Sequence, residues 1–341
     1  MAIEEIRGAR WGRLGTWALL LKTCGVPDPS VLDPVGRLLL ITRACVQPMT
    51  LTAAAIAGLL AVGRDDVRWG LFALAAVGIV VAHAANNMIN DYFDLSEGLD
   101  TADYPRTLYA PHPVVAGVVT RAGLGRAIVV ANGIDAAIMG ALIYARGWAI
   151  GGFALAGLVI SVGYVAPPLR LKAKGLGEPS VFVIWGPLMV GGTYFAATGS
   201  IPMVIVWASV PYALLVTTVL FGKHIDKLEW DRAAGVATLP VMLGEGAARR
   251  VTQVLFATFY VSIAILIATG VLSLWTLAVA VAAPTLVRTW RTYDRSKPPD
   301  PPPRYPLWPL WFGPWAFLHA RRAGMLLVLG MGLGATLSLA G

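Results

Sequence analysis

Acidic residues are concentrated in two short stretches of this 341-residue chain. Eight of the 19 Asp and Glu residues lie within 91–103 and 226–231, each after a long apolar run. On a helix of 3.6 residues per turn, Asn87, Asn90 and Asp94 would share one face. Amide and carboxylate oxygens suit Mg²⁺, which one or two carboxylates commonly hold together with substrate phosphates. We therefore expect a magnesium–phosphate site here, the alternative being an ordinary solvated helix end.

The second acidic stretch reads Lys-His-Ile-Asp-Lys-Leu-Glu-Trp-Asp-Arg over 223–232. Lys227 and Asp231 are four residues apart, so part of this stretch could be a simple helical ion pair. Two acidic sites on one side of the chain could instead bracket a diphosphate through two metal ions. On that interpretation the candidate metal ligands are Asn90, Asp91, Asp94, Asp226 and Asp231.

Basic residues near both stretches are the natural complement of a phosphate. The Lys ammonium is a compact point charge suited to phosphate groups. Such residues follow the fourth apolar run and the first acidic stretch, although membrane topology alone could explain any one of them. The candidate substrate-binding residues are Asn87, Arg106, Tyr164, Arg170, Lys172, Lys174, His224 and Lys227, and the candidate catalytic residues are Asp94, Asp231 and Lys172.

The elements that position these residues are predicted to be membrane helices. The chain is 57% hydrophobic and 13% charged, whereas a soluble domain carries about 25% charged residues. Its mean hydropathy is +0.68. A span requires about 20 mainly apolar residues. That length predicts nine spans, at 38–61, 69–90, 125–145, 148–166, 179–198, 201–221, 251–270, 272–288 and 323–340.

The distribution of basic residues predicts the orientation of these spans. One side of the nine-span arrangement holds only Arg64, Arg68 and Arg146, three of the 27 Lys and Arg residues. The positive-inside rule therefore places the N-terminus and both acidic stretches in the cytoplasm, with the chain crossing the cytoplasmic (inner) membrane many times. The net charge of +8 has the same explanation, so we do not infer nucleic-acid binding.

The alternation of acidic and basic loops along the chain predicts the domain organisation. Acidic stretches follow spans two and six, and basic loops follow spans four and eight, which suggests two related four-helix halves plus one helix. We expect an all-α integral membrane domain over 37–341, preceded by a segment over 1–36 with an interfacial helix. Two cysteines, Cys24 and Cys45, are too few for a disulfide framework and are predicted to be small buried hydrophobic residues.

Asp135 is expected near the middle of the third span, where a carboxylate is costly and is a functional candidate by default. A structural carboxyl group that links helices is the alternative. His83 precedes Asn90 by two turns and would line the same cavity or serve a structural role. His112 and His319 are expected in loops and carry no functional signal.

These motifs resemble those of the UbiA superfamily of intramembrane prenyltransferases. Residues 90–94 (Asn-Asp-Tyr-Phe-Asp) and 98–100 (Gly-Leu-Asp) look like its first Asp-rich motif. They are most similar to the branch that prenylates 1,4-dihydroxy-2-naphthoate in menaquinone synthesis. Residues 231–235 and 238–240 look like the end of the second motif, and 106–108 (Arg-Thr-Leu) is similar to the animal relatives. The resemblance covers roughly residues 37 to 340.

The second motif departs from the family pattern, which usually reads Asp-x-x-x-Asp. Lys227 stands four residues before Asp231, and the nearest earlier acid, Asp226, is one residue further away. One residue rotates a helical position by about 100°, so Asp226 does not simply replace the missing acid. Glu229 is the other acid nearby, and the composition of the second metal site stays open.

The resemblance implies Mg²⁺-dependent transfer of a prenyl group from an allylic diphosphate to an aromatic or quinone-precursor acceptor within the membrane. Mg²⁺ on Asn90, Asp94 and the second motif would hold the diphosphate, and no obligate protein partner is implied. A membrane terpene cyclase of the same superfamily and a polytopic transporter are the alternatives. Donor chain length, acceptor identity and oligomeric state stay open at this point.

Overall fold

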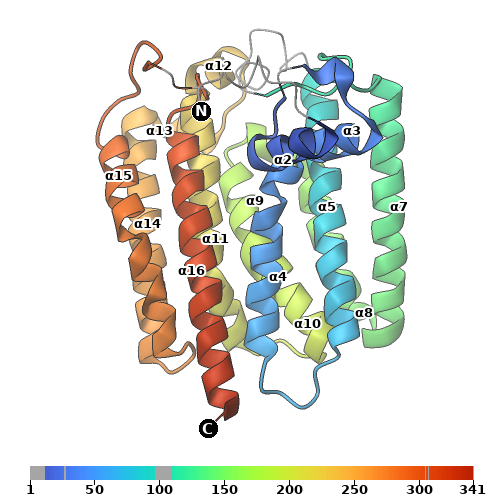
Figure 1. Cartoon of the computed structure of the whole chain (residues 1–341), viewed down its shortest axis with the longest axis vertical. Helices are drawn as coiled ribbons and strands as arrows, with labels where there is room; N and C mark the ends of the chain where they lie inside the picture. The colour runs from blue at the N-terminus through green and yellow to red at the C-terminus, as the bar shows by residue number, and fades with distance from the viewer. Residues whose placement is uncertain (1–11, 27, 97–109, 304, 306, 341) are drawn as a thin grey trace.

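The computed structural model describes residues 12–340 except 27, 97–109, 304 and 306. The described part is helical and contains no strand, only an isolated bridge between Lys174 and Ala237. Long helices run side by side along the longest axis of the molecule (Figure 1). The predicted all-α architecture is confirmed for this part of the chain.

Eight helical segments in the described residues are long and apolar enough to cross a membrane. Each coincides with one of the predicted spans, and most differ at their ends. They are Ala44–Ala61 (a short turn and α4), Trp69–Ser96 (α5), Arg121–Arg146 (α7), Trp148–Val165 (α8), Gly177–Thr198 (α9, a π-helical turn and α10), Met203–Asp226 (α11), Glu245–Ala268 (α14) and Phe312–Ser338 within α16.

The remaining predicted span, 272–288, consists of two short helices. A 3₁₀ helix over Leu274–Ala282 continues directly into α15 over Ala283–Tyr293, and this segment is not among the eight. The 3₁₀ helix packs closely on α16, since a Cβ on Gly330 would lie 2.5 Å from the carbonyl oxygen of Trp275. Eight of the nine predicted spans therefore correspond to long apolar helices in the described chain, and the ninth is not confirmed.

The first and last helices correct the predicted boundaries. The apolar run at 38–61 is broken after α3 (Pro34–Ile41), and α4 begins at Gln47. The last helix, α16 (Phe312–Ala340), begins eleven residues before the predicted position. His319 therefore lies inside this helix and is buried, not in a loop as predicted. His112 is buried as well, and its Nε2 lies 3.2 Å from the carbonyl oxygen of Asp91.

The segment before α4 lies across one end of the bundle, where α2 (Arg13–Thr23) and α3 run transverse to the long helices (Figure 1). Asp33 caps α3 by accepting a hydrogen bond from the Gly36 amide at 2.7 Å. A disulfide joins Cys24 to Cys45 across a Cα–Cα distance of 5.3 Å. The prediction of two separate buried thiols was therefore wrong, because the fold of α2 onto the bundle brings the two residues together.

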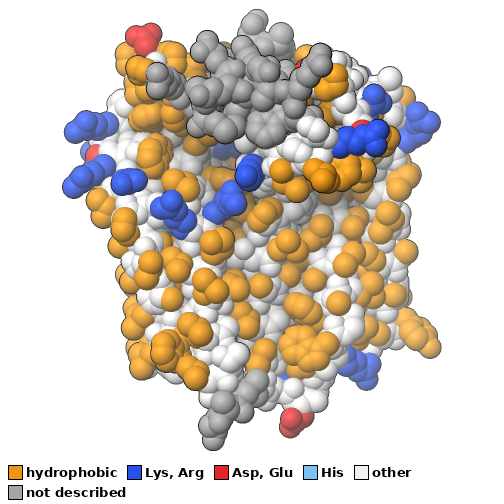
Figure 2. Space-filling view, in the orientation of Figure 1, with side chains coloured by type: hydrophobic (Ala, Val, Ile, Leu, Met, Phe, Trp, Pro, Cys, Tyr) orange, Lys and Arg blue, Asp and Glu red, His pale blue; other side chains and the backbone are white. Residues whose placement is uncertain are grey.

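The surface has the charge distribution of a membrane protein. Hydrophobic side chains cover the middle of the molecule, and Lys and Arg side chains form a band near the end where α2 and α3 lie (Figure 2). The loop after α8 meets the loop after the short helix α12 (Leu228–Ala233) at this end through the Lys174–Ala237 bridge. Lys172 in the loop after α8 also reaches Asp94 near the end of α5. Candidate site residues that are distant in sequence are therefore brought together at one end.

Candidate active site

A cavity of about 430 Å³ opens among α5, α7, α8 and α11. Both Gly78 and Asp94 line it, and they are sixteen residues apart on α5. At 1.5 Å per residue, the cavity therefore extends about 24 Å along that helix. Its deep part is lined mainly by apolar side chains such as Leu142 and Phe153, and its ionisable side chains other than Asp135 and His83 gather at the end near Asp94. The cavity thus combines a polar mouth with a long apolar interior.

The first acidic stretch forms one wall of the mouth. Asn90 and Asp94 both line the cavity, one helical turn apart on α5. Asn90 Oδ1 is buried and has no hydrogen-bond partner within the described part of the chain. Asp94 Oδ1 accepts a hydrogen bond from Lys172 Nζ at 2.5 Å. One unsatisfied amide oxygen beside a carboxylate is a donor set that fits Mg²⁺, so these two residues could hold the ion.

Asp91, a predicted metal ligand, lies on another face of α5. Its carboxylate is 0% exposed, forms an ion pair with Arg43 and lies 3.9 Å from His112 Nε2. Among the residues described, Asp91 is not part of the cavity wall. One residue of rotation around the helix separates it from Asn90, and this turns its side chain away. We therefore leave Asp91 out of the metal site, whereas Asn87 does line the cavity as predicted.

The second acidic stretch contributes basic side chains, not carboxylates, to the cavity wall. Lys223, His224 and Lys227 line the mouth. Asp231 lies 3.6 Å from Lys227 Nζ and is buried, but it does not belong to the described lining of the cavity. Glu229 pairs with Arg232 at an exposed position. The part of this stretch that faces the cavity therefore carries ammonium groups, although carboxylates were predicted there.

Asp226, another predicted metal ligand, caps a helix. Its Oδ1 and Oδ2 accept hydrogen bonds from the amides of Phe312 and Gly313, each at 2.8 Å. These amides begin α16, where the helix dipole favours a negative charge. Near this cap, burial lowers the pKa of the Lys297 ammonium while the Asp226 carboxylate opposes that shift. With both oxygens committed to α16, Asp226 is removed from the proposed metal site.

His224 is held by a buried carboxylate. Its Nδ1 lies 2.7 Å from Glu178 Oε1, and both side chains are almost fully buried. A carboxylate accepts a hydrogen bond from the Nδ1–H group, which leaves Nε2 as the ring nitrogen available to a cavity ligand. Tyr164 lines the same part of the cavity and packs on Gly177, the residue before Glu178. The predicted residues His224 and Tyr164 therefore both reach the cavity.

The basic loop after α8 divides into one cavity residue and two outside it. Lys172 lines the mouth and is largely buried. Lys174 is exposed and donates to the carbonyl oxygen of Pro168 at 3.1 Å. Arg170 has a left-handed backbone with φ of 45° and does not belong to the described cavity lining. Arg106 lies outside the described residues.

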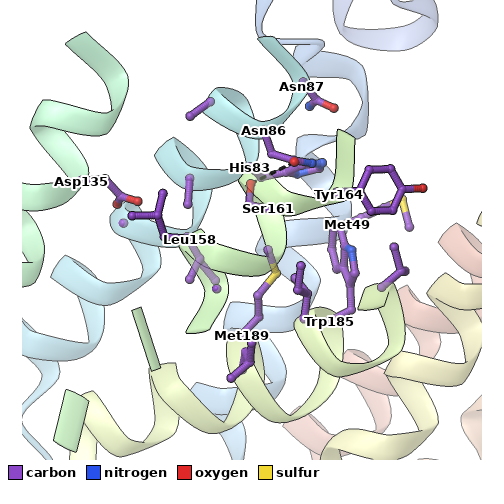
Figure 3. A pocket seen from close by; sticks show the side chains of 18 of the residues that line it. Met49, His83, Asn86, Asn87, Asp135, Leu158, Ser161, Tyr164, Trp185 and Met189 are labelled. Atoms are coloured by element: carbon purple, nitrogen blue, oxygen red, sulfur yellow. Dashed lines mark hydrogen bonds between the residues drawn. The ribbon is translucent and has the colours of Figure 1, made fainter. Parts of the chain in front are cut away.

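The interior of the cavity carries a few polar groups (Figure 3). Ser161 donates a hydrogen bond to Asn86 Oδ1 at 2.9 Å, and His83 Nδ1 lies 2.7 Å from the Thr50 hydroxyl. Asp135 also lines the cavity and is close to Gly78, where a Cβ would lie 3.5 Å from Asp135 Oδ1. The predicted mid-membrane carboxyl group is therefore part of the cavity wall.

Comparison with known proteins identifies the architecture that this cavity belongs to. Residues 51–319 match the model of the UbiA prenyltransferase family. The chain belongs to the UbiA prenyltransferase family. It is therefore a prenyltransferase and a multi-pass membrane protein, as the sequence motifs predicted.

Curated relatives in this family act on naphthoate-type compounds. The chain is 27% identical to a 1,4-dihydroxy-2-naphthoate octaprenyltransferase of Bacillus subtilis, over 74% of this chain and 82% of that protein. It is 28% identical to the Escherichia coli protein of the same name, over 70% and 77% of the two chains. A 2-carboxy-1,4-naphthoquinone phytyltransferase of Synechocystis is 28% identical over 64% and 68%.

Solved UbiA structures share the fold. A UbiA homologue from Aeropyrum pernix superposes with a TM-score of 0.64 at 18% identity, over 84% of this chain and 97% of that one. A UbiA homologue from Archaeoglobus fulgidus, bound to GPP and Mg²⁺, superposes with a TM-score of 0.54 at 18% identity, over 85% and 99%. At this identity the likeness concerns the fold.

Two cavity residues of this UbiA member, and one buried carboxylate behind them, were missed as site residues. Arg43 and Lys223 line the mouth, and Glu178 orients His224. Arg43 is one of the basic residues on the side that the positive-inside rule places in the cytoplasm, and it lines the cavity while pairing with the buried Asp91 carboxylate. Lys223 precedes His224 in the quoted motif, so proximity to the second acidic stretch was the signal that could have found it.

The structural role of Asp226 can be separated from metal binding by substitution. Asp226→Asn keeps the side-chain shape but leaves only one acceptor oxygen for the two α16 amides. We expect a loss of about 1–3 kcal/mol of stability, since a buried amide loses its partner, with a lower thermal unfolding midpoint in detergent. Mn²⁺ binding should be unchanged. Unchanged stability together with lost Mn²⁺ binding would return Asp226 to the metal site.

Proposed function

We propose that this protein transfers a prenyl group from an allylic polyprenyl diphosphate to an aromatic acceptor of the 1,4-dihydroxy-2-naphthoate type, with Mg²⁺ as cofactor. The observation that supports this most strongly is the shape of the cavity, whose charged mouth continues into an apolar interior about 24 Å long along α5. A diphosphate fits the mouth and an isoprenoid chain fits the interior. The naphthoate enzymes among the relatives support the acceptor class.

The mouth residues would bind and activate the diphosphate. Asn90 and Asp94 would hold Mg²⁺, which when bound supplies a Lewis acid to the phosphate oxygens. Lys172 and Lys227 line the same mouth and would donate to those oxygens, stabilising the charge that develops there. The bond between C1 and oxygen then breaks, and its electron pair leaves with the diphosphate.

The acceptor would lie beside His224 and Tyr164, the polar groups next to the lysines. In our proposal the acceptor hydroxyl passes its proton to His224 Nε2 while an electron-rich ring carbon forms the new bond to C1 of the prenyl group, which gives a dienone. That ring carbon then loses its hydrogen as a proton or its carboxyl group as CO₂, the oxygen takes a proton back from His224, and the ring is aromatic again. Glu178 is a positioning residue, because it fixes the imidazole tautomer through Nδ1. The apolar walls exclude water that would otherwise capture the allylic cation.

We also propose that the mouth faces the cytoplasm across the inner membrane. Arg64, Arg68 and Arg146 are the only basic residues that the predicted topology assigns to the opposite side. The positive-inside rule then places the end with Asp94 and Lys172 in the cytoplasm. A water-soluble acceptor precursor could reach the mouth from that side while the prenyl donor enters from the lipid.

The enzymatic proposal is tested by incubating purified protein with labelled geranylgeranyl or a longer prenyl diphosphate, Mg²⁺ and 1,4-dihydroxy-2-naphthoate. A prenylated aromatic product is expected from the wild-type protein. Asp94→Ala should lower turnover by at least about a hundredfold, because it removes the carboxylate of the metal site. Asp65→Ala is the control, since Asp65 is exposed at the opposite end of the bundle.

The outcomes of this assay separate the alternatives. A cyclic hydrocarbon or alcohol formed without acceptor would identify a terpene cyclase instead. Absence of diphosphate release under every condition would contradict both enzymatic readings and favour a transporter. Full activity of Asp94→Ala would remove the first acidic stretch from the mechanism.

The His224–Glu178 pair predicts a kinetic effect on the acceptor half of the reaction. Glu178→Gln keeps a hydrogen-bond acceptor but removes the charge that stabilises an imidazolium, so kcat should fall by about ten- to a hundredfold. His224→Asn should lower kcat further. The KM for the prenyl diphosphate should change less than threefold in both variants, whereas a mainly raised donor KM would instead assign His224 to diphosphate binding.

A further inference from the structure

The two acidic stretches of the mouth are chemically unequal. On α5, the cavity receives an unsatisfied amide oxygen from Asn90 and a carboxylate from Asp94. From the second stretch it receives Lys227, whose side chain lines the cavity although the residue is only 5% exposed. The carboxylate of Asp231 lies 3.6 Å from the Lys227 ammonium and outside the described cavity wall.

The remaining acids near the second stretch are also committed elsewhere. Both oxygens of Asp226 accept amide hydrogen bonds from α16. Glu229 is exposed and paired with Arg232. In the part of the chain that the structure describes, no group of three His, Cys, Asp or Glu side chains could hold a metal ion. The residues on this wall therefore do not fit a divalent cation.

An ammonium group in this position has the electrostatic effect that a metal ion would have. Lys227 is a basic residue that lines the same cavity as Asn90 and Asp94 but comes from another segment of the chain, and it is buried with its Nζ 3.6 Å from the Asp231 carboxylate. A divalent cation placed next to it would be repelled by like charge. A diphosphate at the mouth could still be held from both sides, by the ion on one wall and by Lys227 on the other.

We propose that this enzyme uses a single divalent cation, held by Asn90 and Asp94, and that the Lys227 ammonium takes the place of a second one. The inference rests on the proposed diphosphate chemistry. It predicts that binding of the diphosphate is linked to one metal ion per chain, and that the charge supplied by Lys227 is present at any metal concentration.

The proposal is tested by counting bound Mn²⁺ in the full-length protein. Purified protein in detergent is saturated with an unreactive prenyl thiolodiphosphate, and Mn²⁺ bound per chain is measured by equilibrium dialysis with electron paramagnetic resonance. One ion per wild-type chain is expected. Lys227→Asp should raise the number to two, because it creates two carboxylates four residues apart with Asp231. Arg250→Asp, an equal charge change at an exposed position on α14, should leave one.

A second variant keeps the test decisive if Lys227→Asp does not fold. Lys227→Gln removes the charge without adding a ligand, so the Mn²⁺ number should stay at one. The Kd for the thiolodiphosphate should rise at least about tenfold at saturating Mn²⁺, because a charged hydrogen bond to the diphosphate is lost. An unchanged Kd would overturn the role of Lys227.

The outcomes also distinguish this inference from the proposed function. Two Mn²⁺ ions per wild-type chain would overturn the single-metal site and leave prenyl transfer standing. Failure of the wild-type protein to bind the thiolodiphosphate at any Mn²⁺ concentration would overturn the proposed function and the inference with it.

Discussion

The architecture of the site depends on buried charge at one end of an apolar bundle. Asp94 on α5 and Lys172 in the loop after α8 approach to 2.5 Å, and Lys227 and Asp231 approach to 3.6 Å nearby. Largely buried charges of this kind are stable only when they are paired or bind an ion. The Asp94–Lys172 pair therefore fixes the loop after α8 relative to α5, whereas the Lys227–Asp231 pair is local. In the proposed mechanism each lysine would exchange its carboxylate partner for a phosphate.

Much of this arrangement follows from sequence alone. The length and hydropathy of the apolar runs predict the eight long helices of the described chain. A membrane-spanning segment must be a continuous apolar helix, because all of its backbone hydrogen bonds have to be made within the segment. Helical periodicity places Asn87, Asn90 and Asp94 on one face, and the structure brings all three to the cavity. Helical periodicity predicts the right face here because α5 is one continuous α-helix from Trp69 to Ser96.

Tertiary contacts account for what the sequence did not predict. Asp226 has the composition of a metal ligand, but its function depends on α16 beginning at Phe312, 86 residues away. Asp91 faces away from Asn90 on α5 and pairs there with Arg43, which precedes it by 48 residues. The Cys24–Cys45 disulfide likewise requires α2 to fold back onto the bundle. None of these pairings leaves a periodic or compositional trace in a single sequence.

The central claim is that the mouth binds diphosphate and the apolar interior binds the prenyl chain. A structure of the protein with Mn²⁺ and an unreactive prenyl thiolodiphosphate tests this most directly. The account predicts anomalous signal from Mn²⁺ between Asn90 and Asp94, phosphate oxygens against Lys172 and Lys227, and the chain running along α5 toward Asp135. A diphosphate bound away from these residues, or a chain outside the cavity, would contradict it.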